Sequence, residues 1–181
     1  ATLSARKAEE GAPLSGHQFG DIYFSIAANV LMERASVPGI TLRAACKTAS
    51  GEGGSARRYD DAPGYFIDAS IFKTFRPGNG HSVSLAASTG FLCWQTKADR
   101  QNDAVMYGIS LGYEYNSIIS LSSEFSGYCG WRHDGDSPSV LKIKILAIPD
   151  KIVSPLLEYD HGFRDWPFDL LRLGIRVQAG G

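Results

Sequence analysis

The sequence has no apolar run that approaches the roughly 20 residues needed by a membrane-spanning helix. This absence excludes a helical membrane protein. It does not exclude a transmembrane β-barrel, whose strands need only about 9–11 residues each. The net charge is only −1, so no strong overall field would attract a polyanion, and we expect no nucleic-acid partner.

Cysteine is also scarce, and its odd count of 3 argues against a disulfide framework. Cys46, Cys93 and Cys129 each fall on the apolar face of a predicted strand. Those strands are two apart in the predicted order, about 9–10 Å, which exceeds the roughly 7 Å Cα separation that a disulfide allows. No Cys-x-x-Cys or nearby histidine pair accompanies them, so we expect small hydrophobic side chains, with no metal site and no cofactor.

A period-two alternation of large apolar with small or polar residues dominates the chain, and it is clearest over residues 104–115. Side chains of a strand point alternately to its two faces, so this segment predicts a strand with one apolar face and one small or polar face. The apolar face carries Val105, Tyr107, Ile109, Leu111, Tyr113 and Tyr115; the other carries Ala104, Met106, Gly108, Ser110, Gly112 and Glu114.

The alternation recurs in ten segments, whose connections are long and short in turn. Outer-membrane barrels combine long extracellular loops with short periplasmic turns in this way. We therefore predict an all-β fold, an antiparallel up-and-down transmembrane β-barrel of about ten strands that forms a single domain over residues 1–181. The predicted strands are 2–7, 22–32, 40–47, 65–75, 82–96, 104–115, 118–131, 140–148, 152–160 and 170–178.

Three features favour a membrane barrel over a soluble protein. Several strands run ten residues or more, against the usual five or six. The polar face is built from small residues, as a crowded barrel interior requires. Aromatic residues gather near strand ends, as in the interfacial girdles of barrels: Tyr65, Phe91, Trp94, Tyr107, Tyr128 and Trp131 toward the long loops, and Phe75, Tyr113 and Tyr115 toward the turns. The alternative is a soluble β-sandwich or ligand-binding barrel, with the apolar face as its core.

The segments Pro155–Asp160 and Leu171–Arg176 resemble the closing hairpin of bacterial outer-membrane β-barrel proteins, a class that includes porins. The Glu-Tyr-Asp strand is also similar to barrels linked to exopolysaccharide export. The resemblance implies a Gram-negative outer-membrane location, with outer-membrane lipid, lipopolysaccharide and other outer-membrane or periplasmic proteins as partners. Members of the class usually end on an aromatic residue, whereas this sequence ends Val177-Gln178-Ala179-Gly180-Gly181. Together with the short first strand, this leads us to expect that the true ends lie beyond the given sequence.

Charged residues on the small, polar face would line the interior of the barrel. Buried charges must pair, so we expect cross-strand ion pairs around Glu158 and Asp160. Such a network serves either a small channel or a structural or assembly component of the outer membrane. The predicted lumen residues are Arg43, Lys47, Asp68, Glu114, Glu124, Lys142, Lys144, Glu158, Asp160, Arg172 and Arg176.

The second alternative is an outer-membrane hydrolase with an aspartate and histidine site at the rim. Barrel proteases use paired aspartates and an Asp-His couple near their extracellular rim. Comparable pairs lie on the predicted long-loop side at Asp60-Asp61, His133-Asp134, Asp136 and Asp160-His161. A general base needs its carboxylate close in space, which sequence order does not supply. We therefore expect a non-enzymatic protein and assign no catalytic residues.

Overall fold

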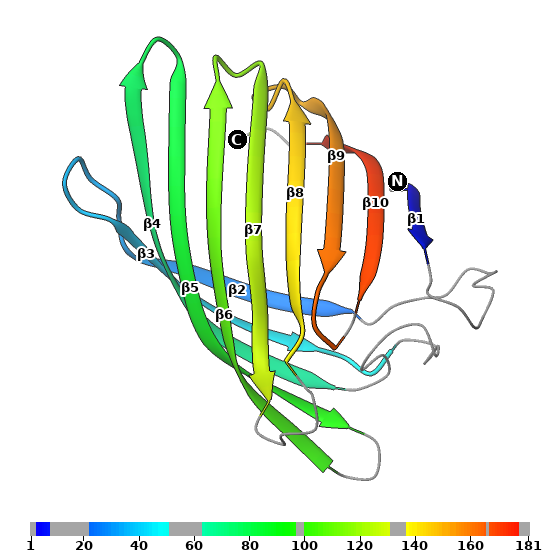
Figure 1. Ribbon diagram of the computed structural model, residues 1–181. Coiled ribbons are helices and arrows are strands. Elements are labelled where there is room, and N and C mark those ends of the chain that lie inside the picture. Colours follow the sequence, from blue (N-terminus) through cyan, green and yellow to red (C-terminus); the bar gives the residue numbers. More distant parts are fainter. Residues whose placement is uncertain are drawn as a thin grey trace.

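The computed structural model describes residues 3–7, 22–50, 63–96, 100–130, 137–165 and 167–177, and these form ten strands of one sheet (Figure 1). The described residues contain no helix that is long and apolar enough to cross a membrane. The strands are β1 (Leu3–Lys7), β2 (Tyr23–Leu31), β3 (Gly39–Lys47), β4 (Gly64–Gly78), β5 (His81–Thr96), β6 (Arg100–Tyr115), β7 (Ile119–Gly130), β8 (Ser139–Ala147), β9 (Val153–Gly162) and β10 (Phe168–Val177).

The strand order is that of an up-and-down barrel. From β2 to β10 each strand pairs antiparallel with the next in sequence, and β1 returns to pair antiparallel with β10, Leu3 opposite Leu173. The predicted fold class is therefore confirmed in its strand number, direction and order. The sheet differs from a closed barrel at one place, because no ladder joins β1 to β2 among the described residues. With five residues, β1 is the shortest strand and has few backbone groups with which to pair.

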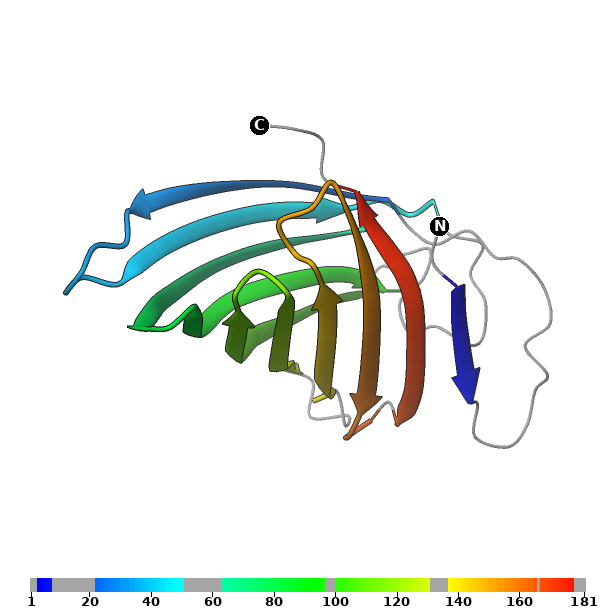
Figure 2. The same ribbon diagram turned by 90° about the horizontal axis from the view of Figure 1, so that it is seen from above.

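The sheet curls in one direction, so it has a concave and a convex face (Figure 2). On β4 to β7, concave-face side chains crowd together and are less exposed than convex ones, whereas β2 is exposed on both faces. Along β6 the convex residues Ile109 and Leu111 are 60% and 51% exposed, while the described residues at alternate positions are partly or fully buried. The crowding accounts for the small concave residues: a Cβ added to Gly90 would lie 2.5 Å from the Cβ of Asp68.

Most predicted strand ends lie within two residues of those in the structure, and two strands, β4 and β6, are longer than predicted by four residues each. β4 continues to Gly78 and includes Pro77. The proline is tolerated because the pairing of β4 with β3 ends at Phe72, so Pro77 lies on a free edge where no ladder hydrogen bond is lost. β6 begins at Arg100, where four residues without apolar alternation still pair with β5.

The turn between β4 and β5 requires left-handed backbone. Asn79 and Gly80 have φ values of 52° and 76°, a region that asparagine and glycine enter most readily. A Cβ on Gly80 would lie 1.5 Å from Oδ1 of Asn116 in the neighbouring β6–β7 turn. Gly80 therefore lets two adjacent turns at this end of the sheet come together.

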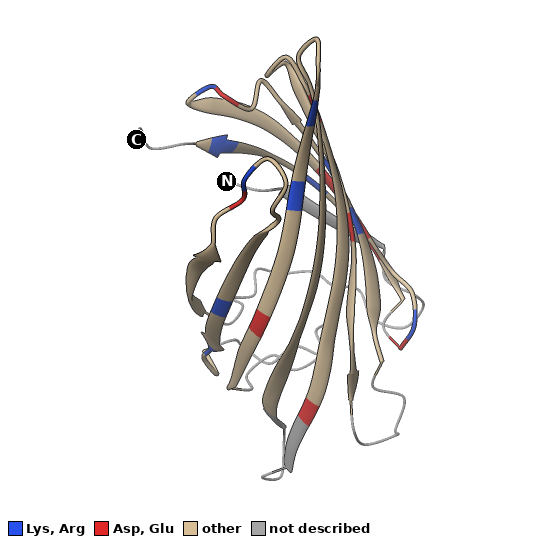
Figure 3. Ribbon diagram, turned by 90° about the vertical axis from the view of Figure 1, so that its left-hand side faces the viewer, with Lys and Arg blue, Asp and Glu red and all other residues tan. Residues whose placement is uncertain are grey.

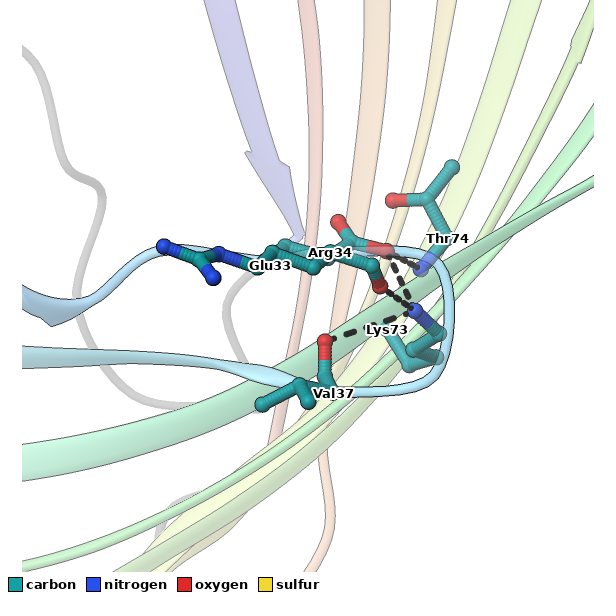
Figure 4. A network of polar contacts seen from close by, with 5 residues as sticks. All are labelled: Glu33, Arg34, Val37, Lys73 and Thr74. Carbon is teal, nitrogen blue, oxygen red and sulfur yellow. Dashed lines mark hydrogen bonds and ion pairs between the residues drawn. The ribbon is translucent and has the colours of Figure 1, made fainter.

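The β2–β3 turn is held against β4 by a polar network (Figure 4). The Lys73 ammonium donates to the carbonyl oxygens of Arg34 and Val37, at 2.5 and 3.4 Å, and lies 3.3 Å from Glu33 Oε1. The same Glu33 oxygen accepts a hydrogen bond of 2.7 Å from the backbone N–H of Thr74. Thr74 lies beyond the last residue of β4 that pairs with β3, so Glu33 satisfies an edge donor that no strand reaches.

We expect Glu33→Gln to weaken this end of the sheet in a pH-dependent way. The Thr74 hydrogen bond, assisted by Lys73, lowers the pKa of Glu33 below its ordinary value of 4.5. A lowered folded-state pKa gives stability that is present above the unfolded value and is lost as pH falls through the folded value. The urea midpoint of Glu33→Gln should be below wild type at pH 7, and the two midpoints should converge in acid. Asp150→Asn, in the exposed β8–β9 turn, is the control, and an equal gap at all pH values would contradict the assignment.

Candidate functional site

The candidate site is the concave face, on which the ladder registers place all eleven predicted lumen charges. Figure 3 shows positions of both signs along the strands. Both signs occur on neighbouring strands. Alternate residues of paired strands share a face, so a charge directly opposite another in the ladder lies on the same side of the sheet. The structure pairs some of these residues and leaves others without an ion-pair partner.

Arg43 and Asp68 form an ion pair across β3 and β4. They are directly opposite in the ladder, and both Nε and Nη2 of Arg43 lie 2.7 Å from Oδ2 of Asp68. Asp68 is buried, whereas nearly half of the Arg43 side chain is exposed. Gly90, opposite Asp68 on β5, has no Cβ that would press on the Cα and Cβ of Asp68. The pair therefore presents one exposed cationic edge to the concave side.

Arg172 is the centre of the second charged group. Its Nη1 contacts Glu158, directly opposite on β9, and Oδ2 of Asp160 at 2.5 Å. Asp160 is almost completely buried, and its other carboxylate oxygen has no partner among the described residues. Arg176, two concave positions further along β10, donates to the carbonyl oxygen of Pro149 in the β8–β9 turn. One guanidinium therefore balances two carboxylates.

Four of the predicted residues form no ion pair with any described residue: Glu114, Glu124, Lys142 and Lys144. Lys142 nevertheless lies in register between Glu124 on β7 and Asp160 on β9, and Lys144 lies opposite Glu158. The remaining residue, Lys47, is buried, with its ammonium 5.5 Å from the centroid of the Trp94 ring. Among the described residues, the concave face thus keeps charge of both signs without an ion-pair partner.

Two adjoining hollows lie on the concave face. One has a volume of about 300 Å³ and the other about 360 Å³, and they share Arg43, Asp68, Ser88 and Glu124 in their walls. Small residues of β4 to β6, including Ser70, Ser110 and Gly108, line the first. Arg43, Asp68 and Glu124 are surrounded by these small residues and therefore border open space.

Two aromatic residues predicted to be in the outer girdle face the concave side instead. Trp94 lies opposite Gly64, and Tyr128 lies opposite Met106. Both are at alternate positions of their strands, the ones whose side chains point to the concave face. The prediction relied on closeness to the strand ends. A count of alternation would have corrected it, because Cys93 and Cys129 were already placed on the apolar face, and adjacent strand residues point to opposite faces. Trp131 lies outside the described residues.

The convex face is apolar over its middle. Exposed apolar side chains cover it from β3 to β10, including Ile67, Ile109, Leu121 and Leu173. The aromatic residues predicted for the outer girdle that lie on this face are Tyr65, Phe75, Phe91, Tyr107, Tyr113 and Tyr115. Tyr107 is not at a strand end, because β6 begins four residues before its predicted start and places Tyr107 in the middle of the strand. Tyr107 also begins a chain of ring contacts that runs through Phe125 and Phe163 to His161 at the long-loop end.

The rim residues of the hydrolase alternative are only partly described. Asp60, Asp61, His133, Asp134 and Asp136 lie outside the described residues.

Asp160 and His161 are adjacent on one strand, so they point to opposite faces. On the convex side, Nδ1 of His161 lies 2.8 Å from Oδ1 of Asp169, which also accepts a hydrogen bond of 2.5 Å from Tyr159. In the described part of the chain, no serine, threonine or cysteine is hydrogen-bonded to His161.

All three cysteines are free. Cys93 is buried, and Cys46 and Cys129 are exposed on the convex face. Within the described ranges, no group of three histidine, cysteine, aspartate or glutamate side chains is placed to hold a metal ion.

Comparison with known proteins gives matches among solved structures only: no protein-family model and no curated protein matches the chain. The chain is similar to a KdgM porin, with a TM-score of 0.39 and 11% identity over 99% of this chain and 100% of the other. A KdgM porin in complex with disordered oligogalacturonate matches with a TM-score of 0.38, 11% identity and the same coverage.

Proposed function

We propose that the chain is a bacterial outer-membrane β-barrel that forms a small channel. The carrying observation is the division of one curved sheet into a convex apolar face and a concave face of small and charged residues. Lipid solvates the first, and water fills the second. The division is sharpest on β6, where apolar Ile109 and Leu111 flank Ser110.

The small number of buried apolar side chains supports a location in the membrane. Only four apolar side chains are buried among the described residues: Leu92, Cys93, Ala104 and Leu146. Far more large apolar side chains are exposed, and in water this would forfeit the main driving force of folding. Contact with lipid removes that cost. A membrane environment is therefore the simplest solvent for this surface.

A soluble sandwich is the less economical alternative. It would need a second layer over the convex face, because the core of a sandwich lies between two sheets. The described strands all belong to one sheet, and the convex side chains of β6 and β10 remain exposed. We therefore place the apolar face in lipid, and we expect outer-membrane lipid and lipopolysaccharide to be its neighbours.

A channel fits the concave face better than a purely structural plug. The ion pairs of Arg43 and Arg172 neutralise some of the charged side chains on this face. The hollows beside Glu124 are nevertheless open space with charged residues in their walls. A polar lumen with fixed charges passes small hydrated solutes and discriminates by sign. The proposal is non-enzymatic, since His161 and Asp160 do not act together.

Conductance in planar bilayers tests the proposal. Wild-type protein refolded in micelles should give discrete conductance steps. Glu124→Lys should shift ion selectivity toward anions, because it replaces an unpaired carboxylate on the wall of both hollows with a cation. The shift is read as a change in reversal potential across a salt gradient.

Asp150→Lys makes the same change of charge in the exposed β8–β9 turn and serves as the control. Its reversal potential should stay much closer to wild type than that of Glu124→Lys. Equal shifts in the two variants would place Glu124 away from the path of the ions. A protein that inserts without any conductance step would contradict the channel and leave a structural role.

A further inference from the structure

Aromatic residues gather on the concave face at the long-loop end of the sheet. Phe66 of β4 and Trp94 of β5 meet edge to face, with ring centroids 5.1 Å apart at 87°. Trp94 is 6.3 Å from Tyr128 of β7, and Phe66 is 6.2 Å from Tyr23 of β2. These four rings, here called the aromatic platform, cross the sheet from β2 to β7.

The platform lies next to charged groups. Asp68 follows Phe66 on the same face of β4, and Glu124 lies two concave positions from Tyr128 along β7. Phe66, Tyr128, Asp68 and Glu124, together with Arg43, all line the hollow of about 360 Å³. Apolar ring faces and carboxylate and guanidinium groups therefore border the same space.

Its location makes the platform unusual for a channel of this kind. Aromatic residues of a membrane barrel serve as interfacial anchors when they face lipid. These four face away from lipid, so they have no role in anchoring. Side chains of this size also narrow the mouth, where small residues such as those on β5 and β6 would leave it open. A role toward a passing solute explains both facts.

We propose that the aromatic platform binds a neutral oligosaccharide that enters the channel; this rests on the proposed channel function. A sugar ring has apolar C–H faces that pack on aromatic rings, and hydroxyl groups that bond to carboxylates and guanidinium groups. A wholly apolar ligand would leave Asp68 and Glu124 desolvated without partners. The wall of the hollow carries the exposed edge of Arg43 as well as the Glu124 carboxylate, so it offers charge of both signs. Hydroxyl groups can donate to the one and accept from the other, which suits a neutral sugar better than an acidic one.

The test is isothermal titration calorimetry on protein refolded in micelles, with maltohexaose as the probe. Maltohexaose should bind, and Trp94→Ala should weaken the affinity roughly tenfold, because Trp94 packs against Phe66 and Tyr128 and holds in place the two rings that line the hollow. Trp94→Phe keeps an aromatic ring and should retain most of the affinity. Phe66→Leu should weaken binding, whereas Phe75→Leu, an exposed aromatic on the convex face, should not. Heat-modifiable gel mobility establishes that each variant is folded.

An alginate hexasaccharide serves as the acidic probe. Binding of this acidic sugar in place of maltohexaose, or equal affinity in wild type and Trp94→Ala, would overturn the proposal. Calorimetry in micelles needs no conductance, so the two proposals fail separately. Conductance steps with no sugar binding would reject the platform and keep the channel. Sugar binding without conductance would reject the channel, and with it the entry route on which this proposal depends.

Discussion

Ile109→Lys is expected to destabilise the folded protein by about 2–4 kcal/mol in a lipid bilayer, the cost of a lysine on the lipid face near the midplane. Ile109 is 60% exposed and lies midway along the convex side of β6, between Val105 and Tyr113. Its ladder neighbours, Ala87 and Phe125, are apolar, so the ammonium would find no counter-ion. The loss is measured as a lower urea midpoint in vesicles and a weaker heat-modifiable band on gels.

The adjacent residue supplies a matched control. Ser110→Lys adds the same side chain to the concave face, directly opposite Glu124, which has no ion-pair partner among the described residues. This variant should fold as well as wild type, because the new ammonium can reach that carboxylate. If Ile109→Lys were instead as stable as wild type and folded in buffer without detergent, the convex face would meet water and the membrane proposal would fail.

The strand pattern was predictable because it depends on local chemistry. Alternation with a period of two, Pro-Gly and Asn-Gly turns, and the sequence of long and short connections together define ten antiparallel strands without knowledge of any contact. The pattern was weakest where apolar residues stop but backbone pairing continues. Arg100–Asp103 joins β6 because its backbone pairs with β5, a contact that composition does not signal.

The aromatic platform was missed for a different reason. Trp94 and Tyr128 lie near strand ends, where aromatic residues commonly anchor a barrel in the membrane interface. Their parity places them with Gly90 and Ser126 on the opposite face. Closeness to the strand ends predicted that these two side chains face lipid, whereas the alternation of side chains predicted that they face the interior. The alternation was the more reliable guide. The backbone alternates without exception in a regular strand, whereas the aromatic girdle is a statistical preference.

The sequence predicted which charged residues lie on the concave face, but not which of them form ion pairs. Sequence parity selected the eleven residues, yet it could not distinguish the paired Arg172 from the unpaired Lys144, although both lie opposite Glu158. The guanidinium presents several donors in a planar fork and can serve two carboxylates, whereas the ammonium is a single point of charge on a flexible stem. Closure also differed from the prediction: the long-range pairing of β1 with β10 forms, whereas no ladder joins β1 to β2, its neighbour in sequence, among the described residues.

Arg172→Met is the second change from which we expect a large effect. It would leave Glu158 and Asp160 as two carboxylates on one face of β9 with their shared guanidinium gone. Asp160 is almost completely buried, so its uncompensated charge is costly. Breaking a buried pair by removing one partner typically costs 3–5 kcal/mol. We expect about 3 kcal/mol, at the lower end of that range, because Lys144 lies opposite Glu158 and can approach it.

The measurement is urea unfolding in vesicles at neutral pH. The triple variant Glu158→Gln, Asp160→Asn, Arg172→Met replaces the whole group with neutral side chains and should return to within about 1 kcal/mol of wild type at neutral pH. That recovery separates the loss of a charge balance from the loss of the arginine's packing. If the triple variant were as unstable as Arg172→Met, packing of the arginine stem would be the cause and the carboxylates would be adequately solvated without it.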